Sequence, residues 1–167
     1  MTGSVRDDLL CVGGLVGSIA GDKIINSCNL GNISMLPKSQ GDVISEGTYC
    51  VGGLAGEIEA YWTCFYYRTH RVGGVILNSF NHGDLDIRIK ANSDAYVYSG
   101  GIVGGNVTGY ILNNYTAGRI VFIDQNGLSR DGEGWTDSGD SIWSDATENS
   151  FVINEYDKGE VLRKTKQ

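Results

Sequence analysis

The sequence is poor in proline and has no long apolar segment. It contains 1 proline and 25 glycines in 167 residues, and 10% of the residues are aromatic. Because a disordered linker would lack this aromatic content, the composition predicts a folded chain with many tight backbone positions. No apolar run approaches the ~20 residues needed to cross a bilayer, so we expect no membrane insertion.

Basic side chains are scarce and scattered. The formal net charge is -7, and lysine and arginine form no cluster. Binding to nucleic acid or to an anionic membrane depends on such clusters, so we exclude both as partners. The segment from Met1 to Asp8 has neither a basic region nor an apolar signal segment. We therefore expect either a cytosolic protein or an excised part of an exported one.

The cysteines and histidines lack the spacing of a metal site. The four cysteines are Cys11, Cys28, Cys50 and Cys64. They include no C-x-x-C pair, and neither of the two histidines stands at a zinc-ligand spacing from them. We therefore expect no metal and no other cofactor. We interpret the cysteines as core residues, with one disulfide left open if the protein is exported.

What the sequence does contain is an internal repeat. Val-Gly-Gly-Leu-Val-Gly at 12–17 returns as Val-Gly-Gly-Leu-Ala-Gly at 51–56 and as Ser-Gly-Gly-Ile-Val-Gly at 99–104. A second element reads aliphatic-x-Asn-x-(Cys or aromatic)-x-x-Gly-x-aliphatic, and it begins at Ile24, Ile76, Ile111 and Val152. The copies lie near 11–35, 50–89 and 99–123, with a partial copy at 150–162 that lacks the first half. The second copy carries a 13-residue insertion, because Gly52 and Asn78 are 26 residues apart where Gly13 and Asn26 are 13 apart.

This repeat predicts an all-β fold. Each copy offers about three short alternating strands with corners between them, and such a unit buries its apolar face only by stacking on its neighbours. We expect a β-solenoid of the parallel β-helix type, with about three full coils, a partial coil and loop insertions, in a single domain spanning 1–167. Stacking would place Cys11 beside Cys50 and bury Cys28 in the place taken by Phe80, Tyr115 and Tyr156 in other copies.

The repeated asparagines have two interpretations. If alternation along a strand holds, Asn26, Asn78, Asn113 and Asn154 point inward and form a hydrogen-bonded ladder at the ~4.8 Å strand spacing. The alternative is that each asparagine forms a turn. We expect the ladder.

The copies resemble the GLUG repeat, named for its Gly-Leu-any-Gly core. Gly14-Leu15-Val16-Gly17 and Gly53-Leu54-Ala55-Gly56 match this core, and Gly101-Ile102-Val103-Gly104 departs from it only by Ile for Leu. The resemblance implies a piece of a large bacterial cell-surface protein, of the kind that includes adhesin-like proteins and the non-catalytic regions of immunoglobulin A-cleaving metallopeptidases. It implies an extracellular or surface location and flanking segments of a parent polypeptide.

The insertions are the expected place for a binding site, because solenoid insertions emerge as loops on one face. The candidate residues are aromatic: Tyr61, Trp62, Phe65, Tyr66 and Tyr67 in the second copy, with Trp135 and Trp143 in the last insertion. If exposed they form a platform for a host protein or glycan, and otherwise they form a hairpin that covers the flank of the solenoid. We expect the hairpin. The acidic residues around Trp135 and Trp143 match no calcium motif, so we interpret them as a solvated loop.

Two functions from different classes remain open. The predicted function is a non-catalytic repeat module, a structural spacer or adhesive binding module, of a bacterial surface or secreted protein. The alternative is a carbohydrate-active β-helix enzyme, a polysaccharide lyase or hydrolase, which needs paired carboxylates on adjacent coils. The repeat cores contain no such recurring pair, and neither a His-Glu-x-x-His nor a Gly-x-Ser-x-Gly motif is present. We therefore predict that the chain is not an enzyme.

Overall fold

The structure is a computed structural model that describes residues 9–36, 44–65, 68–89, 91–106, 109–124, 136–137, 143–146, 151–153, 156–157 and 161–165, with side chains over 9–36, 47–59, 72–88, 96–105 and 109–121. The regular elements within these ranges are all β-strands. The expectation of an all-β chain with stacked parallel strands is confirmed. No described segment forms a helix long and apolar enough to cross a membrane.

Five strand positions recur in the same order along the chain. The first position comprises β1 (Leu9–Gly13), β6 (Ile44–Gly52), β11 (Ala91–Gly100) and β16 (Thr136–Asp137). The second comprises β2 (Val16–Ala20), β7 (Ala55–Phe65), β12 (Val103–Asn106) and β17 (Trp143–Ala146). The third comprises β3 (Lys23–Ile25), β8 (Arg68–Leu77), β13 (Gly109–Leu112) and β18 (Phe151–Ile153). The fourth comprises β4 (Cys28–Asn29), β9 (Phe80–Asn81), β14 (Tyr115–Thr116) and β19 (Tyr156–Asp157). The fifth comprises β5 (Ile33–Met35), β10 (Leu85–Ile89), β15 (Ile120–Asp124) and β20 (Val161–Thr165).

Equivalent strands from successive copies lie side by side and parallel. At the third strand position the register runs through Ile24, Ile76, Ile111 and Val152. The prediction that Cys11 and Cys50 are neighbours is confirmed, because they are direct partners in β1 and β6. Both thiols are free. The offset between copies that the repeat predicted is therefore the offset at which the strands pair.

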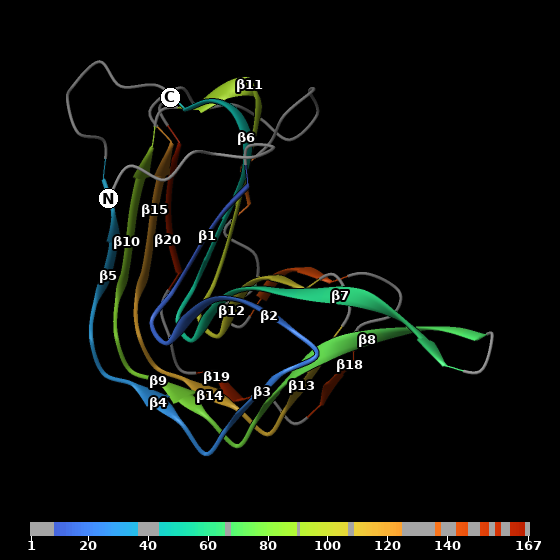
Figure 1. The fold of residues 1–167 in the computed structure, drawn as a ribbon. Coiled ribbons are helices and arrows are strands. Elements are labelled where there is room, and N and C mark those ends of the chain that lie inside the picture. The colour runs from blue at the N-terminus through green and yellow to red at the C-terminus, as the bar shows by residue number, and fades with distance from the viewer. Residues whose placement is uncertain are drawn as a thin grey trace.

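Two apolar clusters fill the space between the stacked sheets. One joins the first and fifth strand positions and contains Val51, Leu85, Ile87, Val97 and Ile120. The other joins the second and third positions and contains Ile19, Ile24, Leu54, Ala55, Ile58, Ile76, Ile102, Val103 and Ile111. Figure 1 shows the corresponding two arms, one with β1 and β6 facing β5 and β10, the other with β2 and β7 above β3 and β8. Each arm thus has its own core.

The repeated glycines stand where the backbones of the two arms meet. A Cβ on Gly53 would strike the carbonyl oxygen of Gly101 in the next copy, and a Cβ on Gly56 would lie 2.5 Å from the backbone nitrogen of Val12. Both contacts would be closer than a Cβ atom tolerates, so only glycine, which has no Cβ, allows the backbones to come this close. The corners also hydrogen-bond across copies, since Leu54 N–H donates to Ile102 O at 2.9 Å. The Gly-Gly-x-x-Gly spacing of the repeat is the consequence of this packing.

The predicted inward direction of the repeated asparagines is wrong, although the predicted bond between copies is present on the surface for one pair, where Asn113 Nδ2 donates to Asn78 Oδ1 at 3.4 Å. Asn26, Asn78 and Asn113 are exposed and have φ angles of 51°, 50° and 55°. Asparagine adopts this left-handed conformation more readily than other non-glycine residues, so the turn-forming alternative is correct. The turn breaks the two-residue alternation, and side chains that the motif placed inward point outward. Asn154 lies outside the described residues.

A different pair of asparagines forms the buried ladder. Asn29 and Asn81 are direct partners in β4 and β9, and the Nδ2 of Asn29 donates to Oδ1 of Asn81 at 2.9 Å. Each asparagine also bonds the glycine two residues later; in the second copy, Gly83 N–H donates to Asn81 Oδ1 at 3.1 Å and Asn81 Nδ2 donates to Gly83 O at 2.9 Å. The third copy has Thr116 at this place, and its buried Oγ1 has no hydrogen-bond partner among the side chains that the structure describes. The ladder therefore ends there.

The fourth copy pairs at all five strand positions. The sequence motif there covers only the second half, yet β16 pairs with β11 and β17 pairs with β12. Trp143 lies opposite Val103, which belongs to the glycine motif of the third copy. The fourth copy therefore has a tryptophan where that motif would continue. A backbone that continues an existing ladder needs less specific sequence than one that begins it, because its partner strand is already in place.

Candidate functional site

The 13-residue insertion of the second copy forms an antiparallel hairpin. Strands β7 and β8 pair with each other from Ala60 opposite Gly73 to Phe65 opposite Arg68. Before that point β7 pairs with β2 as far as Glu59, and beyond it β8 resumes pairing with β3 at Val75. Figure 1 shows the two strands extending past the rest of the stack. The predicted hairpin is thus confirmed for the backbone.

The predicted site residues are brought together only in part. Tyr61, Trp62 and Phe65 lie on β7 in this hairpin, opposite Val72, Arg71 and Arg68. Tyr66, Tyr67 and Trp135 lie outside the described residues. Trp143 begins β17 in the fourth copy. The expectation that the hairpin aromatics cover the flank of the solenoid remains a prediction, as does the alternative that they form a binding platform.

A second aromatic group, which the sequence placed in the core, lies on the surface. Cys28, Phe80 and Tyr115 share one column across β4, β9 and β14 in the predicted register. The predicted burial of Cys28 is wrong, because its side chain is exposed, and Phe80 is 38% exposed. His82 bridges the rings of this column, with its centroid 5.5 Å from Phe80 and 5.6 Å from Tyr115.

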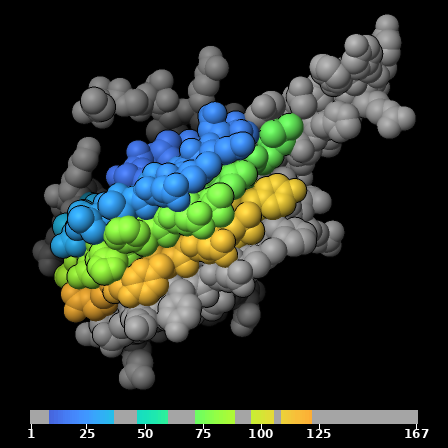
Figure 2. All heavy atoms as spheres, turned by 90° about the horizontal axis from the view of Figure 1, so that it is seen from below, coloured from blue at the N-terminus to red at the C-terminus, as the bar shows by residue number. Residues whose placement is uncertain are grey.

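The exposed column belongs to a larger mixed face. We call it the lower face; it is formed by the third and fourth strand positions and contains Ile25, Leu30, Phe80, His82, Tyr110 and Tyr115, with the exposed Asn26, Asn78 and Asn113 between the two positions. Tyr110 is 48% exposed and Leu30 is 69% exposed. Figure 2 shows this face with the first three copies as adjacent blue, green and orange bands. It offers apolar rings and amide groups side by side, a combination suited to ligands that have both apolar and hydroxyl surfaces.

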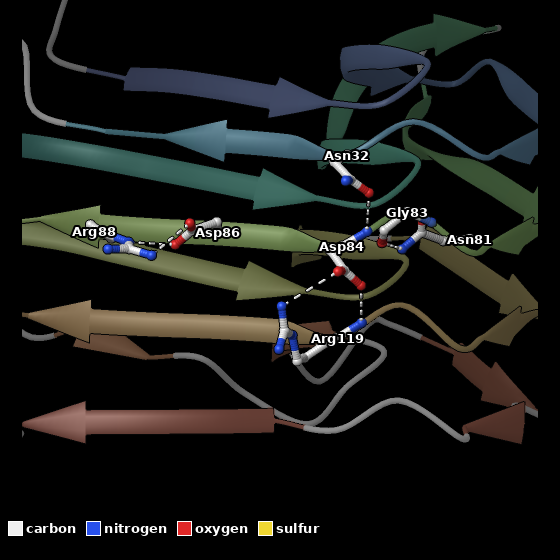
Figure 3. Close-up of polar contacts among 7 residues, drawn as sticks. All are labelled: Asn32, Asn81, Gly83, Asp84, Asp86, Arg88 and Arg119. Carbon is white, nitrogen blue, oxygen red and sulfur yellow. Dashed lines mark hydrogen bonds and ion pairs between the residues drawn. The ribbon is translucent and has the colours of Figure 1, made fainter.

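A shallow polar groove lies beside the fifth strand position. Its volume is about 190 Å³, and its charged residues are Asp84, Asp86, Arg88 and Arg119. Figure 3 shows these side chains engaged with one another. Arg88 holds Asp86 through two hydrogen bonds of 2.8 and 3.0 Å, and Asp84 Oδ1 accepts the backbone N–H of Arg119 at 2.8 Å.

The polar side chains of the groove form hydrogen bonds with one another and with neighbouring copies, which differs from the arrangement of a catalytic site. Asp84 N–H donates to Asn32 Oδ1 at 2.9 Å, so side-chain oxygens cap backbone N–H groups one copy further along. Glycosidic chemistry needs one carboxyl group that donates a proton and a second that acts as base or nucleophile. Asp84 and Asp86 instead hold arginines or backbone donors. The contacts of Asp84 connect neighbouring copies, whereas the Asp86–Arg88 pair stays within β10.

One further cluster of chemically active side chains is present in the described part of the chain. Cys11, Cys50 and Glu57 bring their ligand atoms within 4.8 Å of one another. The hydrogen bond with Cys50, burial and the Glu57 carboxylate raise the pKa of the Cys11 thiol. Without a cation the thiol is therefore held protonated, and a cation that binds the sulfur must displace its proton.

Comparisons with protein-family models, with curated proteins and with solved structures each returned no match. Any function of this chain is therefore inferred from its own residues.

An unbroken two-residue period along the motif does not predict the lower face, because it places the aromatic column in the core. One signal in the sequence could have revealed it: each copy has two successive aliphatic residues, as in Ile24-Ile25, immediately before the asparagine. Two adjacent aliphatic residues on a strand cannot both face the core, so an apolar outward position was already implied. The left-handed asparagine then keeps the following column outside.

Proposed function

We propose that the chain is a non-catalytic repeat module of a bacterial surface or secreted protein. In this proposal the stacked copies form a β-solenoid that continues into flanking segments of a parent polypeptide, and the lower face binds a glycan. The GLUG resemblance supports the surface location.

The residue-for-residue register across copies supports the proposed solenoid. Columns such as Cys28, Phe80, Tyr115 and Tyr156 hold through all four copies. A solenoid is the architecture in which every copy contacts only its neighbours and one strand position repeats at each turn. The two arm cores and the glycine corners support the same interpretation.

The binding part rests on the exposed rings of the lower face. A monomeric protein seldom leaves several large apolar side chains together in water without a use for them. Phe80 and Tyr110 are 38% and 48% exposed, and the exposed amides of Asn26, Asn78 and Asn113 lie beside them, with Asn113 Nδ2 donating to Asn78 Oδ1 at 3.4 Å. Aromatic rings stack on the apolar faces of sugars while amides bond hydroxyl groups, so a saccharide matches both components.

The experiment is a glycan-array screen of the purified chain, followed by affinity measurements on variants. The face variant carries Phe80→Ala and Tyr110→Ala. The matched control carries Leu9→Ala and Leu10→Ala, which remove side chains that are 41% and 47% exposed on β1. A third variant carries Trp62→Ala and Tyr66→Ala in the hairpin segment.

We expect the face variant to lose at least about tenfold in glycan affinity, since stacking on one ring contributes on the order of 1 kcal/mol. The control should bind as the unmodified chain does. Loss in the hairpin variant alone would move the site to the insertion. Binding to matrix proteins but to no glycan would contradict the proposed ligand class.

A further inference from the structure

We propose that Cys11, Cys50 and Glu57 form a binding site for a thiophilic divalent cation, Zn²⁺, that joins the first copy to the second. This site is independent of the proposed glycan binding. Cys50 is 1% exposed and Glu57 is 7% exposed, while Cys11 is half-buried, so one edge of the cluster opens to solvent. Two thiols and a carboxylate are ligands that zinc accepts in proteins.

The spacing of the three side chains matches a tetrahedral ion. With Zn–S distances of ~2.3 Å and a Zn–O distance of ~2.0 Å, a tetrahedron requires sulfurs ~3.8 Å apart and a sulfur and an oxygen ~3.5 Å apart. The Cys11 Sγ and the Glu57 Oε2 are 3.3 Å apart, and all three ligand atoms lie within 4.8 Å of one another. Small side-chain rotations therefore bring all three atoms onto one ion.

The strand geometry favours a shared ion over a disulfide. Cys11 and Cys50 are direct partners on parallel strands, where side chains leave the backbone in the same direction. Their Cβ atoms are then separated by about the ~4.8 Å strand spacing, whereas a disulfide needs a Cβ separation near ~3.8 Å. A cation between the sulfurs needs no such approach.

Among the described residues this cluster occurs between the first and second copies, and a glycine of the third copy lies beside it. In the third copy the partner of Cys50 is Tyr98 and the partner of Glu57 is Gly105. A Cβ on residue 105 would lie 3.1 Å from the Cys50 Sγ, so glycine there keeps that side of the cluster clear. When the ion binds, it replaces the two thiol protons, which pass to solvent, and water completes the fourth position.

The test compares two variants that each keep two of the four cysteines. The site variant carries Cys28→Ser and Cys64→Ser and retains the cluster, and the control carries Cys11→Ser and Cys50→Ser and retains the other two thiols. Both are titrated with Co²⁺ in a non-thiol reductant, and Zn²⁺ is then added in competition. Circular dichroism verifies folding, and Cys11→Ala with Cys50→Ala replaces the control if the serines unfold it.

We expect the site variant to bind one Co²⁺ with the near-ultraviolet thiolate-to-cobalt band and the visible bands of a tetrahedral ion, and Zn²⁺ to displace it. The control should bind at least about a hundredfold more weakly, and Glu57→Gln in the site variant should weaken binding about tenfold. Equal spectra in the site variant and the control would overturn the proposal. So would quantitative loss of the Cys11 and Cys50 thiols to a disulfide in air, because the pair would then be a redox site.

Discussion

Leu15 in the first copy and Leu54 in the second occupy the same place in the repeat, yet Leu15 is 45% exposed and Leu54 is fully buried. Ile102 takes this place in the third copy and is also fully buried. The second copy has a partner on both sides, since β6 lies between β1 and β11. In the first copy β1, β4 and β5 stand at the ends of their sheets.

The difference teaches that burial in this protein is set by neighbours in the stack. The same apolar residue is core in one copy and surface in another, although both copies place it in the same bend between the first and second strand positions. Stability should therefore be uneven, with the first copy contributing less per residue than the second. Four predictions test or sharpen this comparison.

The largest expected difference is between Leu54→Ala and Leu15→Ala. Leu54→Ala leaves a cavity in the buried cluster and should lower the free energy of unfolding by about 3 kcal/mol. Leu15→Ala should lower it by less than about 1 kcal/mol, because its side chain is already partly in water. Urea denaturation of the two variants measures both values, and equal losses would contradict the comparison.

The buried asparagines should differ in the same direction. Asn81→Ala removes the bonds to Gly83 and to Asn29 and leaves buried polar groups without partners, so we expect a loss of about 2 kcal/mol. Asn29→Ala should lose about 1 kcal/mol, since its local partner Gly31 is exposed and water can replace the bond. Thermal and urea unfolding of the single variants and of the double variant would show the order and the coupling.

A gain in stability is expected at Thr116, where the asparagine ladder stops. Thr116→Asn, a change of similar volume, replaces a hydroxyl that has no partner with an amide that can bond Asn81. The free energy of unfolding should rise by about 1 kcal/mol. Thr116→Val is the control, since it replaces the hydroxyl by a methyl group of similar size and adds no amide. Destabilisation by the asparagine would show that the ladder cannot be extended.

The smallest effect should come from an outward side chain of the second copy. Among the described residues Arg88 bonds Asp86, two residues earlier on the same strand, and both groups reach water. Arg88→Ala should leave the melting temperature unchanged within error, at low salt and at high salt. A clear drop in either buffer would mean that the groove contacts stabilise the stack more than exposed ion pairs usually do.

Much of the stacking could be predicted from the sequence because the repeat sets the register. The partnership of Cys11 with Cys50 follows from counting residues, since a ladder has one offset that aligns all copies. The direction of side chains after the asparagine could not be derived in this way. A single left-handed residue reverses the outward and inward sides, and residue type alone does not fix that conformation. The packing of the aromatic residues in the hairpin segment remains a prediction. The position of Glu57 beside the two thiols could not be predicted, because it depends on how the chain turns between the first and second strand positions.

The one-to-one register has a consequence for how such a chain can change over generations. Duplicating a whole copy adds one strand at each of the five positions and lengthens the stack by about ~4.8 Å, without altering any existing contact except at the junction. Losing a copy shortens it by the same step. Reach can therefore be adjusted in equal increments by recombination between similar gene segments, while the lower face gains or loses one row of side chains each time.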